Sequence, residues 1–192
     1  MNMEEFLAPY IDTSPVKAKS TLSYIKQTDS YSCVPVAIAN AINWSNDADY
    51  GDIMLVDLLR DVCATKETTR TRSGGVKKAG GTGPGGITAG IASRPELELQ
   101  ETVVEPSIKD IKRHLDAGGA VILCYKNWKT KYTGHSVLID KRRGNNYHVV
   151  NGRGSDVCKW EDNVYIRKIL SRKAQGGYKS HAYLINKGNY NE

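Results

Sequence analysis

The 192-residue sequence lacks the segments that would place a chain in a membrane or export it. No apolar run approaches the roughly 20 residues that a membrane-spanning helix needs. The first residues, MNMEEFLAPYIDTSP, carry two glutamates and no apolar core, so they do not form a secretory signal. These absences predict a cytoplasmic protein with no membrane partner.

Cysteine is scarce, and its spacing does not indicate metal binding. The four cysteines, Cys33, Cys63, Cys124 and Cys158, include no CxxC pair, and no local Cys and His spacing is typical of a zinc site. Four cysteines could form two disulfides, but without a secretory signal reduced thiols are the default expectation. We therefore expect neither a metal nor a cofactor.

The glycine-rich stretch SGGVKKAGGTGPGG lacks the pattern of a phosphate-binding loop. A Walker-type loop reads GxxxxGK[ST], whereas Gly75 to Gly80 is followed by Gly81 and Thr82. The stretch instead predicts a loop that leads into a short helix near Ile87.

The remaining composition is that of an ordinary globular protein, with 40% hydrophobic and 25% charged residues. The length predicts a single domain over residues 1–192, in which Pro9 and Pro15 make residues 1–20 an extended lead-in. A formal charge of +6 favours encounter with acidic partners but does not establish nucleic-acid binding.

Apolar residues recur at helical spacing early in the chain and at strand spacing later. The expected helices are CVPVAIANAINW (33–44), GDIMLVDLLRDVCAT (51–65) and PSIKDIKRHLDAGGA (106–120). The expected strands are TLSYIKQT (21–28), AVILCYK (120–126), HSVLID (135–140), NYHVVNG (146–152), NVYIRKIL (163–170) and HAYLINK (181–187). Helices followed by strands predict an α+β fold with an antiparallel sheet.

Cys33 is the candidate nucleophile because it stands where the first expected helix begins. The helix N-terminus should stabilise a thiolate and lower the pKa of the Cys33 thiol. Gln27 lies six residues earlier, where its side-chain amide could join the Cys33 backbone N–H in binding a developing oxyanion. As an isolated residue, however, Cys33 would more often be a buried structural thiol.

A thiol nucleophile needs a base, and the base needs an orienting group. His135 begins one expected strand and Asn151 ends the next, so the two residues are expected to lie near each other as base and orienter. Asp140 is the rival orienter, but it is five residues from His135 on the same strand, and strict alternation points it to the opposite face.

These motifs, in this order, resemble the papain-like cysteine peptidases, and most closely their bacteriocin-processing, C39-like branch. That branch commonly reads Q-x-D-x-x-C-G-P-x-x-x-A-N, and this chain reads QTDSYSCVPVAIAN. The segments IKRHLDAGGAVILCYKN and GHSVLID are also similar, so the resemblance covers residues 21–152. Val34 replaces the usual glycine after the cysteine, and Asn151 stands where the branch usually has aspartate. The resemblance implies an N-terminal helical part whose Cys-bearing helix packs on a C-terminal antiparallel sheet.

The resemblance also implies a cysteine peptidase that cleaves peptide or isopeptide bonds through a Cys33, His135 and Asn151 triad. The same groups could transfer or deamidate acyl groups, because the acceptor is not chosen by the triad. A non-catalytic peptide-binding module remains an alternative, on account of Val34. Nucleic-acid binding, suggested by YKNWKTKY and KRRGNNYH, is the disfavoured alternative.

A peptide or protein is therefore the expected partner. The loop from Arg70 to Gly86 should border the substrate groove, where Lys77 and Lys78 would favour acidic substrates.

Overall fold

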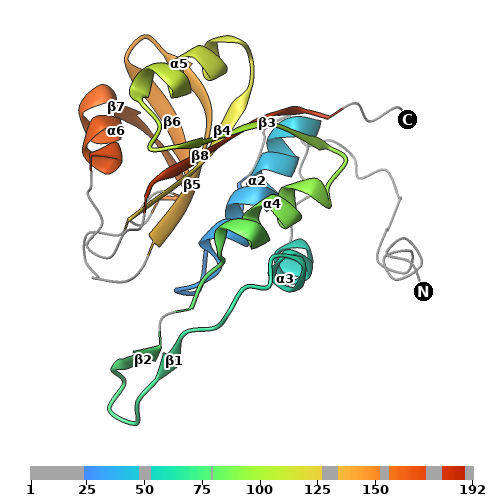
Figure 1. The fold of residues 1–192 in the computed structure, drawn as a ribbon, viewed down its shortest axis with the longest axis vertical. Helices are drawn as coiled ribbons and strands as arrows, with labels where there is room; N and C mark the ends of the chain where they lie inside the picture. The colour runs from blue at the N-terminus through green and yellow to red at the C-terminus, as the bar shows by residue number, and fades with distance from the viewer. Residues whose placement is uncertain are drawn as a thin grey trace.

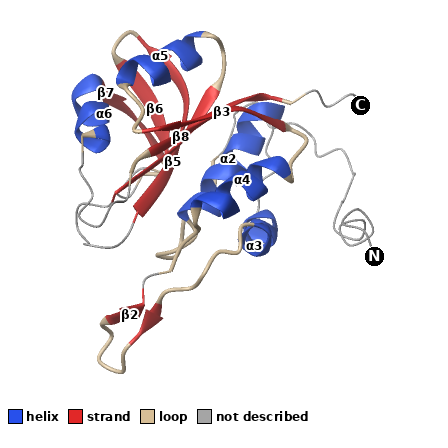
Figure 2. Cartoon of the chain, in the orientation of Figure 1, coloured by secondary structure: helices blue, strands red, loops and turns tan. Residues whose placement is uncertain are grey.

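The structure, a computed structural model, describes residues 24–47, 53–78, 80–126, 134–151, 156–171 and 179–188. The expected lead-in over residues 1–20 lies outside this part. Within it, the chain forms five helices, a six-stranded sheet and a separate two-stranded hairpin (Figures 1 and 2).

The main sheet is antiparallel between every pair of neighbouring strands. In spatial order its strands are β3 (Leu97–Val104), β8 (His181–Lys187), β4 (Ala120–Lys126), β5 (Gly134–Arg143), β6 (Asn146–Val150) and β7 (Cys158–Asp162). Together with the helices that precede and cover it, this sheet confirms the α+β fold class.

Helices cover both faces of the sheet (Figure 1). One face packs against α2 (Cys33–Asn46), with α3 (Ile53–Val62) and α4 (Pro84–Ala92) beyond it. The other face packs against α5 (Ile108–Asp116) and α6 (Asn163–Leu170). The fold therefore has two hydrophobic clusters, one on each side of the sheet.

Helix α2 is the central element of the first cluster. Every residue from Val34 to Trp44 is buried, as expected of a helix that is apolar on all sides. The buried side chain of Asn40, near the middle of the helix, accepts from the Ile25 N–H at 2.7 Å and donates to the Ile25 carbonyl at 3.0 Å. Asn40 thereby ties the segment before the helix to the helix interior.

The three expected helices are confirmed as α2, α3 and α5, and the short helix near Ile87 is α4. Helix α5 begins at a capping box, in which Ser107 and Asp110 bond to each other's backbone. The strands expected at 120–126, 135–140, 146–152 and 181–187 are confirmed as β4, β5, β6 and β8.

Two strand predictions are corrected by the structure. Residues 163–170 form helix α6, because Asp162 caps its N-terminus and Ile166 and Ile169 are buried while Val164 is 70% exposed. Residues 24–28 of the strand expected at 21–28 have no regular structure, and the rest of that strand lies outside the described residues. Strands β3 and β7 were not predicted.

The separate hairpin is a second unpredicted feature. Strands β1 (Thr69–Arg70) and β2 (Val76–Lys78) pair beyond a base where Lys66 and Gly81 exchange two backbone hydrogen bonds. Gly80 fits this base because a side chain there would lie 2.2 Å from the Lys66 carbonyl oxygen. We call residues 66–78, with 80 and 81, the basic arm; it extends away from the rest of the molecule (Figure 1).

Across the described residues, no helix combines the length and the apolar character that crossing a bilayer requires.

Candidate active site

The loop before α2 is held by one carboxylate. Asp29 accepts hydrogen bonds from the N–H groups of Tyr31 and Ser32 at 2.8 and 2.7 Å and from the Ser32 hydroxyl at 2.6 Å. The Arg60 guanidinium of α3 pairs with the same carboxylate. Burial acts to raise the pKa of Asp29, but the bonds from Ser32, Tyr31 and Arg60 outweigh it and lower that pKa. The loop therefore delivers Cys33 to the first position of α2, as the sequence predicted.

The pKa of the Cys33 thiol shifts in the direction opposite to the one that the sequence predicted. Burial is the largest influence and raises the pKa of Cys33, while the backbone N–H and hydroxyl of Ser136 and the N–H groups of Val34 and Cys33 act to lower it. The donors at the helix N-terminus are present, but they do not compensate for desolvation of the sulfur. The expected pKa below that of a free thiol is thus wrong for this structure, in which burial raises the pKa of Cys33.

Ser136, which sequence reasoning did not select, is the β5 side chain that contacts this thiol. It is 3% exposed, and its hydroxyl lies 3.0 Å from the sulfur of Cys124 on β4. Strand alternation places Ser136 and Leu138 on the α2 face of the sheet, whereas Val137 belongs to the opposite cluster. The even spacing of Ser136, Leu138 and Asp140 in HSVLID is the signal that could have found it.

Asn151 follows β6 in a left-handed backbone conformation, with φ of 62°. Asparagine tolerates this conformation better than most residues. The turn directs its side chain toward α2, where Nδ2 donates toward Gln27 Oε1 at 3.3 Å, Cys33 O at 3.5 Å and Ser136 O at 3.3 Å. The Asn151 amide therefore joins the three segments that meet at the thiol.

His135 contacts Asn151 through the main chain. Its Nε2 lies 2.8 Å from the Asn151 carbonyl oxygen, and its ring meets the Tyr125 ring edge to face with centroids 5.8 Å apart. A carbonyl only accepts, so Nε2 carries a proton and donates it in this contact. In this structure the His135 ring is thus held by the Asn151 carbonyl oxygen and not by the Asn151 side chain.

Gln27 lies beside Asn151 in the segment that Asn40 ties to α2. Its Nε2 donates to the Asp29 carbonyl at 2.9 Å, and its Oε1 accepts from Asn151. The structure thus joins Gln27, Cys33, Asn151 and Ser136 in one network on the α2 side of the sheet. His135 is attached to this network at the Asn151 carbonyl.

Asp140, the rival orienter, belongs to a separate buried network. Its Oδ1 lies 2.7 Å from His148 Nδ1, and its other oxygen accepts from the Tyr24 hydroxyl. The His148 ring lies between the rings of Tyr24 and Trp160, with centroids 5.6 and 5.3 Å away. Both carboxylate oxygens are therefore engaged by partners other than His135.

The described residues contain no group of three or more His, Cys, Asp or Glu side chains arranged to hold a metal ion. The donors at the site are a thiol, an imidazole, two amides and a hydroxyl. Such a set suits acyl transfer by a thiol nucleophile, provided that the His135 ring and the thiol come within reach of each other.

Comparison with solved structures identifies the fold. The peptidase domain of Streptococcus ComA, a bi-functional ABC transporter involved in a quorum-sensing pathway, matches with a TM-score of 0.52 at 15% identity, covering 87% of this chain and 100% of that domain. A protein described as a C39-like peptidase from Bacillus anthracis matches with a TM-score of 0.53 at 12% identity, covering 88% of this chain and 98% of that one. No protein-family model matches the sequence, and no curated protein matches it. The chain therefore has the papain-like fold of C39 peptidase domains, which confirms the fold that the sequence resemblance implied.

Proposed function

We propose that the protein is a papain-like cysteine peptidase that cleaves peptide or isopeptide bonds, with Cys33 as nucleophile. The observation that carries this proposal is the position of Cys33. It is the first residue of a buried helix in a C39-type fold, and the Asn151 amide reaches its carbonyl oxygen. Gln27 and Asn151 lie beside it, and His135 contacts Asn151 through the main chain, which supports the proposal.

The proposed reaction uses these residues in two steps. The Cys33 sulfur attacks the substrate carbonyl carbon while the thiol proton passes to His135 Nδ1. The Cys33 backbone N–H and the Gln27 amide bind the oxyanion, and His135 then protonates the departing amine. Water next hydrolyses the thioester, with His135 again taking and returning the proton. A different acceptor at this second step would make the same apparatus a transferase.

Burial raises the pKa of the Cys33 thiol, and His135 lies against Tyr125 and the Asn151 carbonyl. Bound substrate would then have to bring Nδ1 to the thiol, since catalytic hydrogen bonds often tighten only in the complex.

The deciding experiment incubates the protein with a diverse peptide pool and follows all mass changes by mass spectrometry. We expect cleavage by the wild type, none by Cys33→Ala, and normal cleavage by the matched control Cys158→Ala, whose sulfur lies on β7. Transfer or deamidation products that depend on Cys33 would revise the acceptor. Cleavage that persists in Cys33→Ala would refute the proposal.

One observation favours a second candidate, a peptide-binding module without catalysis. The β5 side chain beside the thiol is Ser136. His135 lies on the same face of the sheet as Tyr125, its register partner on β4, and that face is opposite to α2. If that arrangement persists with substrate bound, no base reaches the thiol. Peptides that bind the wild type and Cys33→Ala equally, without any mass change, would establish this candidate instead.

A further inference from the structure

The basic arm concentrates the positive charge of the chain. Residues 66–81 contain five basic residues and one acidic residue, so this segment contributes +4 of the formal charge of +6. The remaining residues are close to electrical balance. An acidic partner will therefore meet its strongest attraction at the arm.

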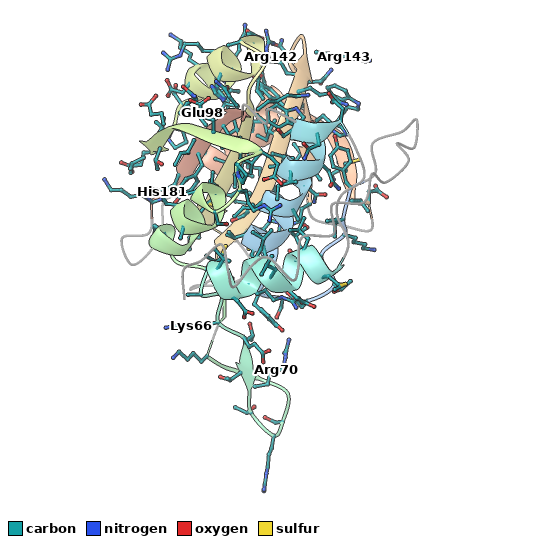
Figure 3. All side chains as sticks on the ribbon, turned by 90° about the vertical axis from the view of Figure 1, so that its right-hand side faces the viewer. Lys66, Arg70, Glu98, Arg142, Arg143 and His181 are labelled. Carbon is teal, nitrogen blue, oxygen red and sulfur yellow. The ribbon has the colours of Figure 1, made fainter. Side chains whose placement is uncertain are left out.

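The cations of the arm are available to a partner. Lys66, Arg70, Arg72 and Lys78 are all exposed, and Figure 3 shows Arg70 on the part of the arm that extends beyond the helices. Arg70 donates to the Gly74 carbonyl oxygen at 3.1 Å, which holds its guanidinium near the tip. Within the described part of the chain, none of these four side chains forms an ion pair with a carboxylate.

The base of the arm rests on the loop that leads to the nucleophile. The Tyr31 hydroxyl lies 3.5 Å from Glu67 Oε1, and the Ser30 hydroxyl lies 3.4 Å from Thr68 Oγ1. Residues 30 and 31 immediately precede the first residues of α2, so the arm begins at the same end of the molecule as Cys33 (Figure 1). The base of the arm therefore lies beside the loop that leads to Cys33.

We propose that the basic arm is a docking element for acidic polypeptide segments, an assignment that rests on the proposed peptidase function. It selects substrates that carry acidic residues some distance along the chain from the scissile bond. From Lys66 to the turn at Gly74 an extended chain spans up to about 26 Å. Acidic residues up to about eight positions from the scissile bond then fall within reach of the arm.

Polypeptide fits the arm better than nucleic acid does. Residues 66–81 contain no aromatic side chain on which an unpaired base could stack. The base of the arm also contacts the loop that precedes Cys33, whose thiol suits acyl chemistry on a polypeptide and not on a nucleic acid. Acidic side chains on a flexible peptide can adapt to cations that are spread along a narrow two-stranded ribbon.

The kinetic test uses a peptide that the protein cleaves, extended by four Glu or by four Gln placed four to eight residues before or after the scissile bond. The variants are Arg70→Gln/Arg72→Gln and the matched control Lys109→Gln/Lys112→Gln, whose lysines are exposed on α5. We expect the Glu peptide to have a kcat/KM at least about tenfold above that of the Gln peptide, and this ratio to fall about three- to tenfold in the arm variant. The control should keep the wild-type ratio.

Salt gives an independent check on the same ratio. The Debye length shortens from about 10 Å at 0.1 M to about 3 Å at 1 M ionic strength. The preference for Glu should therefore nearly disappear in 1 M NaCl. A ratio near one in the wild type at low salt, or an equal fall in the α5 control, would overturn the docking proposal.

A binding experiment separates the docking proposal from the peptidase proposal. Fluorescence anisotropy measures a labelled Glu-rich peptide binding to Cys33→Ala, with and without the two arm substitutions. Binding that depends on Arg70 and Arg72 supports docking even if no peptide is ever cleaved. Cleavage without arm-dependent binding refutes docking and leaves the peptidase proposal intact. Tighter arm-dependent binding of a 20-base-pair DNA duplex than of the peptide would replace the polypeptide with nucleic acid as the partner.

Discussion

Replacing Asn151 with aspartate distinguishes the observed geometry from the pattern of the C39-like branch. The two side chains have the same shape, but only the amide can donate a hydrogen bond. In the structure the Asn151 amide faces three acceptor oxygens, on Gln27, Cys33 and Ser136, and the residue is 6% exposed. A carboxylate in this place would face the same oxygens without a donor.

The magnitude follows from those three contacts. Leaving a buried polar group without its partner costs about 1–3 kcal/mol. At about 2–4 °C per kcal/mol for a chain of this size, Asn151→Asp should lower the Tm by about 2–12 °C at pH 7. The new carboxyl would be neutral more readily when folded, so its folded pKa would exceed the unfolded value near 3.9. The difference in Tm between the variant and the wild type should therefore shrink as the pH falls through the folded pKa, because the protonated carboxyl can donate a hydrogen bond.

Thermal denaturation followed by circular dichroism at pH 7 and pH 5 measures this effect. Asn145→Asp is the matched control, since Asn145 is exposed in the turn between β5 and β6. Asn151→Gly adds a functional readout, because glycine suits the left-handed backbone and keeps the carbonyl that holds His135. We expect it to retain more turnover than His135→Ala. A variant with aspartate that is as stable as the wild type at pH 7, or more active, would show that the side chain faces the imidazole and that our reasoning is wrong.

Three further outcomes test the site. Gln27→Ala should reduce peptide turnover by about 10²-fold with little change in Tm, and an unchanged rate would remove Gln27 from the oxyanion site. Burial raises the pKa of the Cys33 thiol, so its alkylation by iodoacetamide, followed by mass spectrometry, should still be accelerating above pH 8.5; a plateau below pH 7 would contradict the buried thiol. Hydrogen bonds lower the pKa of Asp29 despite its burial. The contribution of Asp29 to the free energy of unfolding is therefore present above about pH 4 and is lost as the pH falls through the folded pKa. Urea denaturation should accordingly show Asp29→Asn less stable than the wild type by about 1–3 kcal/mol at pH 7 and by less at pH 3.

The core of the fold was predictable because its elements have unmistakable periodicity. The fully apolar CVPVAIANAI and AVILCY segments can only be buried, and they became α2 and β4. NVYIRKIL was mistaken because its β-branched residues favour strands, whereas the Asp162 cap and the burial of Ile166 and Ile169 select a helix. Strand β3 was missed because LELQETVV is an edge strand with mostly exposed residues, so little of its pattern is set by burial.

The site was predictable in composition and less so in geometry. Residue order placed Cys33 at a helix start and put Asn151 beside His135, but no pattern shows that Asn151 adopts a positive φ. In the structure its carbonyl oxygen, and not its side chain, contacts His135. The raised pKa of Cys33 also escaped prediction, because desolvation depends on how closely the surrounding elements cover the sulfur. The roles of Gln27, Cys33, His135 and Asn151 in catalysis stay predictions.

The clamp between Asn40 and Ile25 has a consequence for motion. Residues 24–28 have no regular structure, and such segments ordinarily open by local fluctuations and exchange their amide hydrogens quickly. The Ile25 amide instead donates to a side chain that is fully buried in the middle of α2. Releasing it requires separating the segment from the helix and leaving the Asn40 amide unpaired in an apolar interior. The Ile25 hydrogen should therefore exchange about as slowly as those of the central strands, and the segment that carries Gln27 should open only when the domain unfolds.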